Sequence, residues 1–351
     1  MNILNKLSPQ FREFLQEEGI DEEIFLFEQT LRYIRIKPDY QITFEQLQQQ
    51  VSNQILPIYE IPTLYSLPAD EKISNLQLYK DGNLYGIDKS SAAVVYSLDI
   101  NKNDTNLLEI CCAPGAKLTF IADLLRLQTK EDGIQRKVFG VDISQNRLNI
   151  TQSIVNKYKL EKFVELILED GTKYKSEILF DKVLIDAECT HEGSIKHLKK
   201  YINKPIQEKN TKKQQKNNKA SKKQLQKNYT NTYTTEQTKA NEWTEEDFNS
   251  RFLDQKKLQQ IYDLQFSLLE NGYRLLKQNG MLIYSTCSFS QKQNEDQIIK
   301  FLELNNDAIL VNPFYSMNQQ QCKSGKIFNT IRFDPKVSNT GGMFIAKIKK
   351  L

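Results

Sequence analysis

Two cysteines in this sequence each follow the end of a short apolar run. In the stretch LIDAECTHEGS the run ends in Asp186, and Cys189 comes three residues later. Farther along the chain, the run MLIY leads into STCS, which contains Cys287. A cysteine thiolate is a strong nucleophile, so two thiols and a carboxylate suit covalent catalysis if the fold brings them together. A single cysteine at the end of a strand is more often a small buried apolar residue. We apply that interpretation to Cys111, Cys112 and Cys322.

A turn of small residues precedes both cysteine segments. The letters CCAPGAK, residues 111–117, join an apolar run to a helix-like pattern. Gly115 permits close backbone approach, and the free N–H groups at the start of the helix suit a nucleotide-like cofactor. The GxGxxG fingerprint of dinucleotide-binding turns is missing.

Acidic residues follow the next two expected strands. Asp142 lies where nucleotide-binding folds place an acid on ribose hydroxyls, and Asp170 could accept hydrogen bonds from an adenine or its neighbours. An aspartate alone could equally cap a helix or a turn. Three acids at successive strand ends after a glycine turn favour a nucleotide-type cofactor. The candidate cofactor-binding residues are Cys111, Cys112, Ala113, Pro114, Gly115, Ala116, Lys117, Asp142, Asp170 and Asp186.

Beyond residue 106, short apolar runs alternate with helix-like patterns, which is typical of a parallel sheet covered by helices on both faces. The expected strands are Leu107–Cys111, Val138–Ile143, Phe163–Leu168, Lys182–Asp186 and Met281–Cys287. The expected helices are Leu118–Leu127, Asn146–Tyr158, Phe248–Leu276 and Asn294–Leu304. Near the C-terminus, Thr330–Phe333 and Met343–Lys347 resemble strands. Ligands of such sheets bind at the carboxyl ends of the strands, so the acids and both cysteines are expected to face one crevice.

Residues 1–85 are expected to form a small α/β module, a candidate for binding RNA, ahead of the main domain, residues 86–351. Ser8 followed by Pro9 is a typical helix start. Thr43 begins a capping-box pattern for a second helix. Residues 32–36 alternate like a strand between them.

A segment rich in Lys, Gln, Asn and Thr, residues 199–241, interrupts the main domain and predicts a mobile insertion. Between Lys199 and Lys227 it contains eleven lysines and one acid, a net charge of +10. Because the whole chain has a net charge of +4, the other residues together carry −6. Such a tract could hold the phosphate backbone of RNA. It could also be a solvated loop or a nuclear import signal.

The composition excludes several classes of protein. No run approaches the ~18 apolar residues of a membrane helix, and the N-terminus lacks the apolar stretch of a secretory signal. The five cysteines are odd in number, so a disulfide framework is not expected. The chain has no CxxC pair and two histidines, which makes a zinc site improbable. We expect an intracellular, reduced protein, in the cytoplasm or nucleus.

The motifs APGAK at 113–117, DAEC at 186–189 and STCS at 285–288, with Asn294 and Glu295, resemble those of the Nol/Nop/Sun-type (RsmB-like) RNA cytosine-5 methyltransferases. The resemblance covers roughly residue 86 to the C-terminus, in the order of the family. It implies a Rossmann-like class I methyltransferase fold, with a mostly parallel seven-stranded sheet and an antiparallel last hairpin. It also implies S-adenosyl-L-methionine as cofactor and RNA, tRNA or rRNA, as partner. Neither a membrane nor a metal is implied, and we expect a monomer.

The resemblance also assigns catalytic roles. Cys287 would add to C6 of the cytosine, which makes C5 nucleophilic. Asp186 would hydrogen-bond near N3 and N4 of the base, and Cys189 would assist loss of the C5 proton and release of the enzyme. Lys117 is a candidate to activate Cys287. His191 and His197 are interpreted as loop residues.

The sequence departs from the family pattern at three places, where it has Glu188 for the usual Pro, Ala116 for a Gly, and Thr190-His191 for Ser-Gly. An acid beside Cys189 would raise the pKa of that thiol and slow product release. The alternatives are a catalytically weak RNA-binding relative, a DNA cytosine methyltransferase, and a methyltransferase acting on a protein or small molecule. The DNA enzymes place their nucleophile after a Pro, and the last class would have no use for two thiols.

Overall fold

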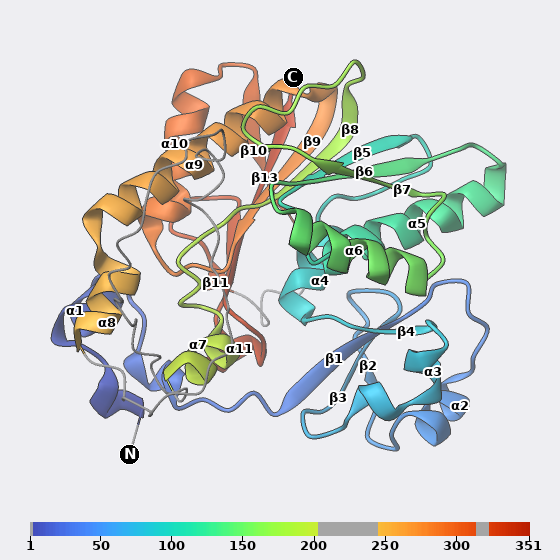
Figure 1. Cartoon of the computed structure of the whole chain (residues 1–351), viewed down its shortest axis with the longest axis horizontal. Coiled ribbons are helices and arrows are strands. Elements are labelled where there is room, and N and C mark those ends of the chain that lie inside the picture. The colour runs from blue at the N-terminus through green and yellow to red at the C-terminus, as the bar shows by residue number, and fades with distance from the viewer. Residues whose placement is uncertain (1–2, 203–244, 314–322) are drawn as a thin grey trace, which may run out of the picture.

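The computed structural model describes residues 3–202, 245–313 and 323–351 (Figure 1). Within them, nine strands form one large mixed sheet in the order β11-β12-β13-β9-β8-β5-β6-β7, with β10 also paired to β13. Its parallel part, β9-β8-β5-β6-β7, confirms the five strands predicted from apolar runs. These strands are β5 (Asn106–Ile110), β6 (Lys137–Asp142), β7 (Val164–Leu168), β8 (Phe180–Asp186) and β9 (Leu276–Thr286).

The other edge of the sheet is antiparallel. β13 (Met343–Lys350) runs antiparallel to β9, and β12 (Thr330–Phe333) pairs with β13, which confirms the last hairpin. The sheet has two strands more than the seven expected, β10 (Ala308–Val311) and β11 (Lys323–Ser324). With two residues, β11 is too short for an alternation pattern to reveal it.

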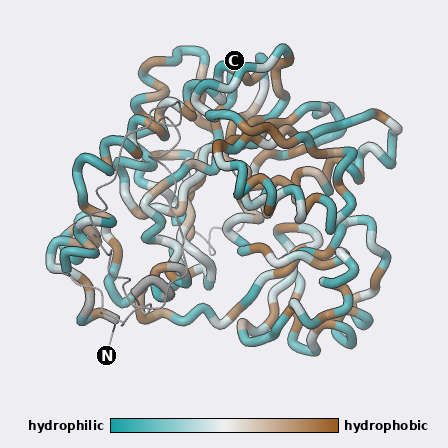
Figure 2. The backbone as a smooth tube through the Cα atoms, in the orientation of Figure 1, coloured by the Kyte–Doolittle hydropathy of each residue, from teal (hydrophilic) through white to brown (hydrophobic). Residues whose placement is uncertain are grey.

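Helices cover both faces of the large sheet, as the wholly apolar strands predict (Figures 1 and 2). Successive strand residues alternate between two cores: Leu184 packs with α4, α5 and α6, whereas Val183 and Ile185 pack with α9 and α10. The first three helices are α4 (Lys89–Tyr96), α5 (Ala116–Asp132) and α6 (Gln145–Lys157). The opposite face carries α9 (Gln255–Arg274) and α10 (Glu295–Leu304).

The first 85 residues divide between two places. The strands β1 (Leu31–Ile36), β2 (Leu56–Pro57), β3 (Leu64–Pro68) and β4 (Leu84–Gly86) form a separate antiparallel sheet in the order β2-β3-β1-β4. It is covered by the short helices α2 (Phe44–Gln50), η3 (Ile73–Asn75) and α3 (Gln77–Lys80), with a core of its own. The capping box at Thr43 is present, with both of its hydrogen bonds to Gln46.

The segment before β1 does not join this sheet and packs against helices of the main domain instead. It comprises η1 (Ile3–Lys6), α1 (Pro9–Glu17) and η2 (Glu22–Phe25). Ser8 caps α1 by accepting a hydrogen bond from Phe11 N, as predicted. Phe11 lies in an aromatic cluster with Phe25, Phe248 and Phe252. The partners of this segment are α7 (Ile195–Ile202), α8 (Glu245–Phe248) and η4 (Asn249–Leu253).

Most of the predicted insertion lies outside the described residues. Residues 199–202 form the last turn of α7, and nothing is described between residues 203 and 244. Cys322 also lies outside the described part of the chain. Among the described helices, none combines the length and the apolar character needed to cross a membrane.

Candidate active site

The turn after β5 places Gly115 at the N-terminus of α5. Gly115 has a φ of +102°, and a Cβ there would lie 2.8 Å from Cγ2 of Thr151 on α6. Only glycine fits this backbone without strain. Ala116 follows as the first helical residue, so its replacement of the family's glycine costs nothing in backbone geometry. The helix therefore presents its free N–H groups at the carboxyl edge of the sheet.

Asp142, at the end of β6, hydrogen-bonds to the two loops nearest to it. Its carboxylate accepts hydrogen bonds from Ala113 N at 3.2 Å and Ser144 N at 3.0 Å. Arg147 lies on the same carboxylate, with Nη1 3.6 Å from Oδ2, and its other amino group donates to Ala113 O. Asp142 is thus buried and largely satisfied by protein groups at the mouth of the Gly115 turn.

Asp170, after β7, behaves as a turn residue in part. Its Oδ1 accepts from the backbone and hydroxyl of Thr172 at 3.0 and 2.7 Å, and Lys173 lies 3.4 Å from Oδ2. Burial raises the pKa of Asp170, but these hydrogen bonds lower it below its usual value. The carboxylate is therefore ionised and half-exposed at the strand end. Its role toward a cofactor stays a prediction.

Asp186, at the end of β8, is held by two neighbours. Lys117 Nζ lies 2.7 Å from its Oδ2, and Ser285 Oγ donates to its Oδ1 at 3.0 Å. Burial lowers the pKa of Lys117, but the charge and hydrogen bond of Asp186 raise it overall. Lys117, predicted as a possible activator of Cys287, makes its hydrogen bond with Asp186.

The turn and the strand before it also contain two cysteines and a glutamate, Cys111, Cys112 and Glu109. Burial raises the pKa of Cys111 and Cys112 above the ordinary thiol range, and both side chains pack in the apolar cores. Glu109 on β5 is fully buried, and its Oε2 has no hydrogen-bond partner among the described residues. Burial raises the pKa of Glu109 well above its usual value.

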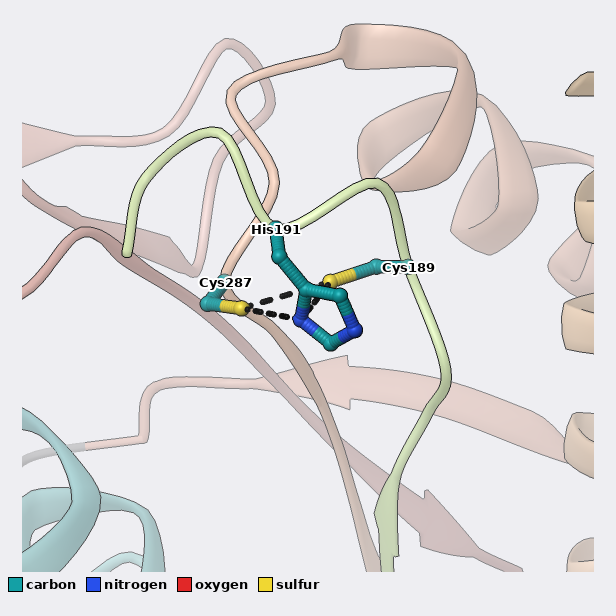
Figure 3. Close-up of side chains that lie close together, drawn as sticks. All are labelled: Cys189, His191 and Cys287. Atoms are coloured by element: carbon teal, nitrogen blue, oxygen red, sulfur yellow. Dashed lines mark hydrogen bonds between the residues drawn. The ribbon is translucent and has the colours of Figure 1, made fainter. Parts of the chain in front are cut away.

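The two strand-end cysteines face each other across adjacent loops (Figure 3). Cys189 comes from the loop after β8 and Cys287 from the loop after β9, and their Sγ atoms lie 3.3 Å apart. Because β8 and β9 are parallel neighbours, with Asp186 beside Ser285, their carboxyl ends bring together residues 98 positions apart. The expected crevice thus gathers both thiols near Asp186.

Residues that the sequence did not single out hold these loops in place. Gly193 N donates to Cys287 O at 3.0 Å, and a Cβ on Gly193 would lie 2.4 Å from that oxygen. Glu192 accepts hydrogen bonds from the Ser288 hydroxyl and from Phe289 N. In the sequence, the only local sign that Glu192 and Gly193 hold the loops is that they stand next to each other shortly after Cys189. The loop therefore needs glycine because of a tertiary contact.

The motif residue Asn294 serves the same purpose from the other side. Thr286 Oγ1 donates to Asn294 Oδ1 at 2.6 Å, and Asn294 Nδ2 donates to Ser288 O at 2.9 Å. Glu295 pairs with Arg332 on β12. Cys287 therefore stands on a loop whose backbone is fixed by side chains at both of its ends.

His191 lies between the thiols and a carboxylate (Figure 3). Its Nδ1 is 3.1 Å from Cys287 Sγ and 3.5 Å from Cys189 Sγ, and its Nε2 is 3.2 Å from Glu188 Oε1. The interpretation of His191 as a loop residue missed this placement. Glu188, expected to act on Cys189, instead directs its carboxylate to the imidazole. The one sequence signal was that two of the three departures from the family pattern, Glu188 and His191, occur three residues apart.

The protonation of this cluster is coupled. The hydrogen bond with Cys189 raises the pKa of the Cys287 thiol, burial raises it further, and His191 opposes both. Burial lowers the pKa of His191, but Cys287 and Glu188 raise it well above its usual value. Partial desolvation raises the pKa of the half-exposed Glu188, but the hydrogen bond from His191 lowers it below its usual value. The thiols of Cys189 and Cys287 and the imidazole of His191 lie within 4.8 Å of one another. The spacing of cysteines and histidines along the sequence, which made a zinc site improbable, did not reveal this cluster.

The chain is similar to several known proteins. A family model described as 16S rRNA methyltransferase RsmB/F matches residues 95–246 and 240–349. The ribosomal RNA small subunit methyltransferase F of Aeromonas salmonicida is 23% identical over 294 residues, 80% of this chain and 49% of the relative. The tRNA (cytosine(72)-C(5))-methyltransferase of Pyrococcus horikoshii is 24% identical over 302 residues, 84% of this chain and 57% of the relative. The chain thus spans about half the length of these curated relatives.

Among solved structures, NSun6 from Pyrococcus horikoshii superposes with a TM-score of 0.70 at 15% identity. The match covers 99% of both chains. This likeness shows the fold, and it confirms the Rossmann-like methyltransferase architecture expected from the motifs.

Proposed function

The chain belongs to the 16S rRNA methyltransferase RsmB/F family, and from that premise we propose that it methylates C5 of cytosine in RNA. The substrate class is tRNA or rRNA, and the methyl donor is S-adenosyl-L-methionine. The observation that carries the proposal is the pair of thiols 3.3 Å apart at the ends of two neighbouring parallel strands. A protein that only binds RNA has no need of two facing thiols.

The residues around the Gly115 turn fit S-adenosyl-L-methionine. The turn leaves no room for a Cβ on Gly115, and the N–H groups of α5 open onto the same edge of the sheet. Asp142 lies where ribose hydroxyls are bound in related folds. Ala113, Pro114 and Gly115 would hold the cofactor from one side and Asp142 and Asp170 from the other. The bound cofactor supplies an electrophilic methyl group.

The chain's own residues then act on the cytosine. The Cys287 thiolate forms a bond to C6, and the electron pair of the C5–C6 double bond makes C5 the nucleophile. Asp186, oriented by Lys117 and Ser285, hydrogen-bonds to the base and favours addition. After methylation, Cys189 takes the C5 proton, the C5–C6 double bond re-forms, and the S–C6 bond breaks with its electron pair returning to Cys287.

A cavity of about 680 Å³ supports an entry route for the base. It reaches Cys287 from between the β1–β4 module and α7, and Arg32, Lys196 and Lys199 are among its lining residues. A cytosine must leave its stack to reach a buried thiol, and basic side chains suit the phosphates beside it. We infer that residues 31–86 act as the RNA-binding module. The oligomeric state and the compartment stay predictions.

The test is a methylation assay with labelled S-adenosyl-L-methionine and RNA from the source cells, followed by bisulfite sequencing. We expect label in the RNA and one cytosine that becomes resistant to bisulfite conversion. In the control, RNA whose cytosine is already 5-methylated should take up no label. Stoichiometric RNA binding without turnover would contradict the proposal. That result would favour the catalytically weak RNA-binding relative.

A further inference from the structure

His191 is placed for proton transfer by its contacts on both nitrogens. Nδ1 faces Cys287 Sγ at 3.1 Å, and Nε2 faces Glu188 Oε1 at 3.2 Å. If Nε2 carries the hydrogen that bonds to Glu188, Nδ1 has a free electron pair directed at the thiol. A carboxylate that fixes the tautomer of a histidine beside a nucleophile is the arrangement that activates many nucleophilic side chains.

The backbone holds His191 in a conformation that it would not adopt by preference. Its φ is +64°, in the left-handed region, which is unfavourable for a histidine by about 1 kcal/mol. Thr190 N, the donor just before it, bonds to Gln293 Oε1 at 3.2 Å, and the Thr190 hydroxyl contacts that of Ser288 at 3.2 Å. Gly193, just after it, bonds to Cys287 O. The loop is therefore fastened to the Cys287 loop on both sides of the imidazole.

Cys287 needs such a partner. Burial and the neighbouring thiol both favour the protonated form of Cys287, which is not nucleophilic. Lys117, the cation suggested by the sequence, makes its ion pair with Asp186, although its charge also interacts with that of Cys287. The other charged groups whose fields reach these side chains are Arg147 on α6 and Arg251 on η4, both acting on Glu188.

We propose that His191 is the general base that deprotonates Cys287, and that Glu188 is the residue that positions it. The use of this step in methylation rests on the function proposed above, whereas thiol activation itself requires neither RNA nor cofactor. The pair Glu188 and His191 thus stands in this chain where the family has Pro and Gly, and supplies a base that the family pattern lacks.

The step balances as a proton transfer. The S–H bond of Cys287 breaks, its proton moves to Nδ1 of His191, and the electron pair stays on sulfur to form the bond to C6. The imidazolium that results keeps its second hydrogen on Nε2, directed at Glu188. When the S–C6 bond breaks at the end of the reaction, sulfur regains the electron pair. The Cys287 thiolate released in that step can then take its proton back from the His191 imidazolium.

The experiment measures alkylation of Cys287 by iodoacetamide as a function of pH, read for each cysteine-containing peptide by mass spectrometry. In the unaltered chain, Cys287 should react at neutral pH because His191 takes its proton during the attack. In His191→Gly, the rate at neutral pH should fall by about tenfold or more, and should rise only in alkaline solution. Glycine tolerates the positive φ, so this variant should fold.

Three controls separate a base from a structural contact. Added imidazole should restore the reactivity of His191→Gly, and it should not restore His191→Asn, whose side chain fills the space. Glu188→Gln should shift the pH profile in the same direction by a smaller amount. His197→Asn changes the chain's other histidine and should leave the profile unchanged.

Two outcomes would overturn the proposal. One is a pH profile of His191→Gly that matches the unaltered chain. The other is an unaltered chain whose Cys287 stays unreactive until EDTA is added, which would mean that the two thiols and the imidazole hold a metal ion. If alkylation of Cys287 behaves as expected but the chain does not methylate RNA, the proposed function is contradicted. The role of His191 as a base is not contradicted by that result.

Discussion

The variant Cys287→Ala is expected to lose RNA methylation by roughly four orders of magnitude or more, the scale of loss when a covalent nucleophile is removed. Without the thiol, C5 of the cytosine is not activated, and the remaining residues only bind and orient. Alanine fits the site, so the fold and binding of S-adenosyl-L-methionine should be retained. The measurements are the initial rate of methyl transfer to RNA and cofactor binding by calorimetry.

Cys322→Ala is the matched control for this variant, because Cys322 is the one cysteine that no motif places at the crevice. It should methylate RNA at the rate of the unaltered chain. A Cys287→Ala variant that keeps its rate within tenfold would show that the attack on C6 comes from elsewhere.

The second large effect is on stability and concerns a buried ion pair between the β1–β4 module and the main domain. Arg35 on β1 lies 2.5 Å from Asp123 on α5, and both side chains are fully buried. The Arg35 guanidinium also stacks between the rings of Tyr85, at 3.7 Å, and Phe120, at 4.5 Å. Arg126 Nη2 lies 2.8 Å from the other oxygen of Asp123. Arg35→Met is expected to lower the free energy of unfolding by about 3 kcal/mol, because it leaves the buried Asp123 charge with Arg126 as its remaining partner.

The double variant Arg35→Met/Asp123→Leu distinguishes this cause from lost packing. Removing both charges should restore most of the stability, since an apolar pair in place of a buried ion pair is often neutral. Chemical denaturation of the unaltered chain and both variants would measure it. A double variant as unstable as Arg35→Met would mean that stacking on the rings, and not the uncompensated charge, is responsible.

Local patterns were enough to predict the framework. Apolar runs identified all five parallel strands, and Ser8 and Thr43 marked helix starts, because both signals depend on neighbours within a few residues. The same logic put the acids and cysteines at one edge of the sheet, where the structure gathers both thiols and Asp186.

Features that depend on contacts between distant segments were not predictable. Residues 3–25 share a core with α7 and η4 through aromatic contacts that no local pattern reveals. The contact of His191 with Cys287 could not be predicted from local pattern, because Cys287 lies 96 positions away. Glu188 was expected to act on the nearest thiol in sequence, but its carboxylate contacts the imidazole across the loop.

The most direct test of the account uses Cys189→Ala, expressed in the source cells and analysed on denaturing gels. If Cys287 attacks the base and Cys189 releases it, this variant should retain RNA covalently, and sequencing that RNA would identify the substrate. The adduct should be absent from Cys189→Ala/Cys287→Ala. Undiminished methylation by Cys189→Ala without any adduct would contradict the assignment of release to Cys189, and an adduct that survives in the double variant would contradict attack by Cys287.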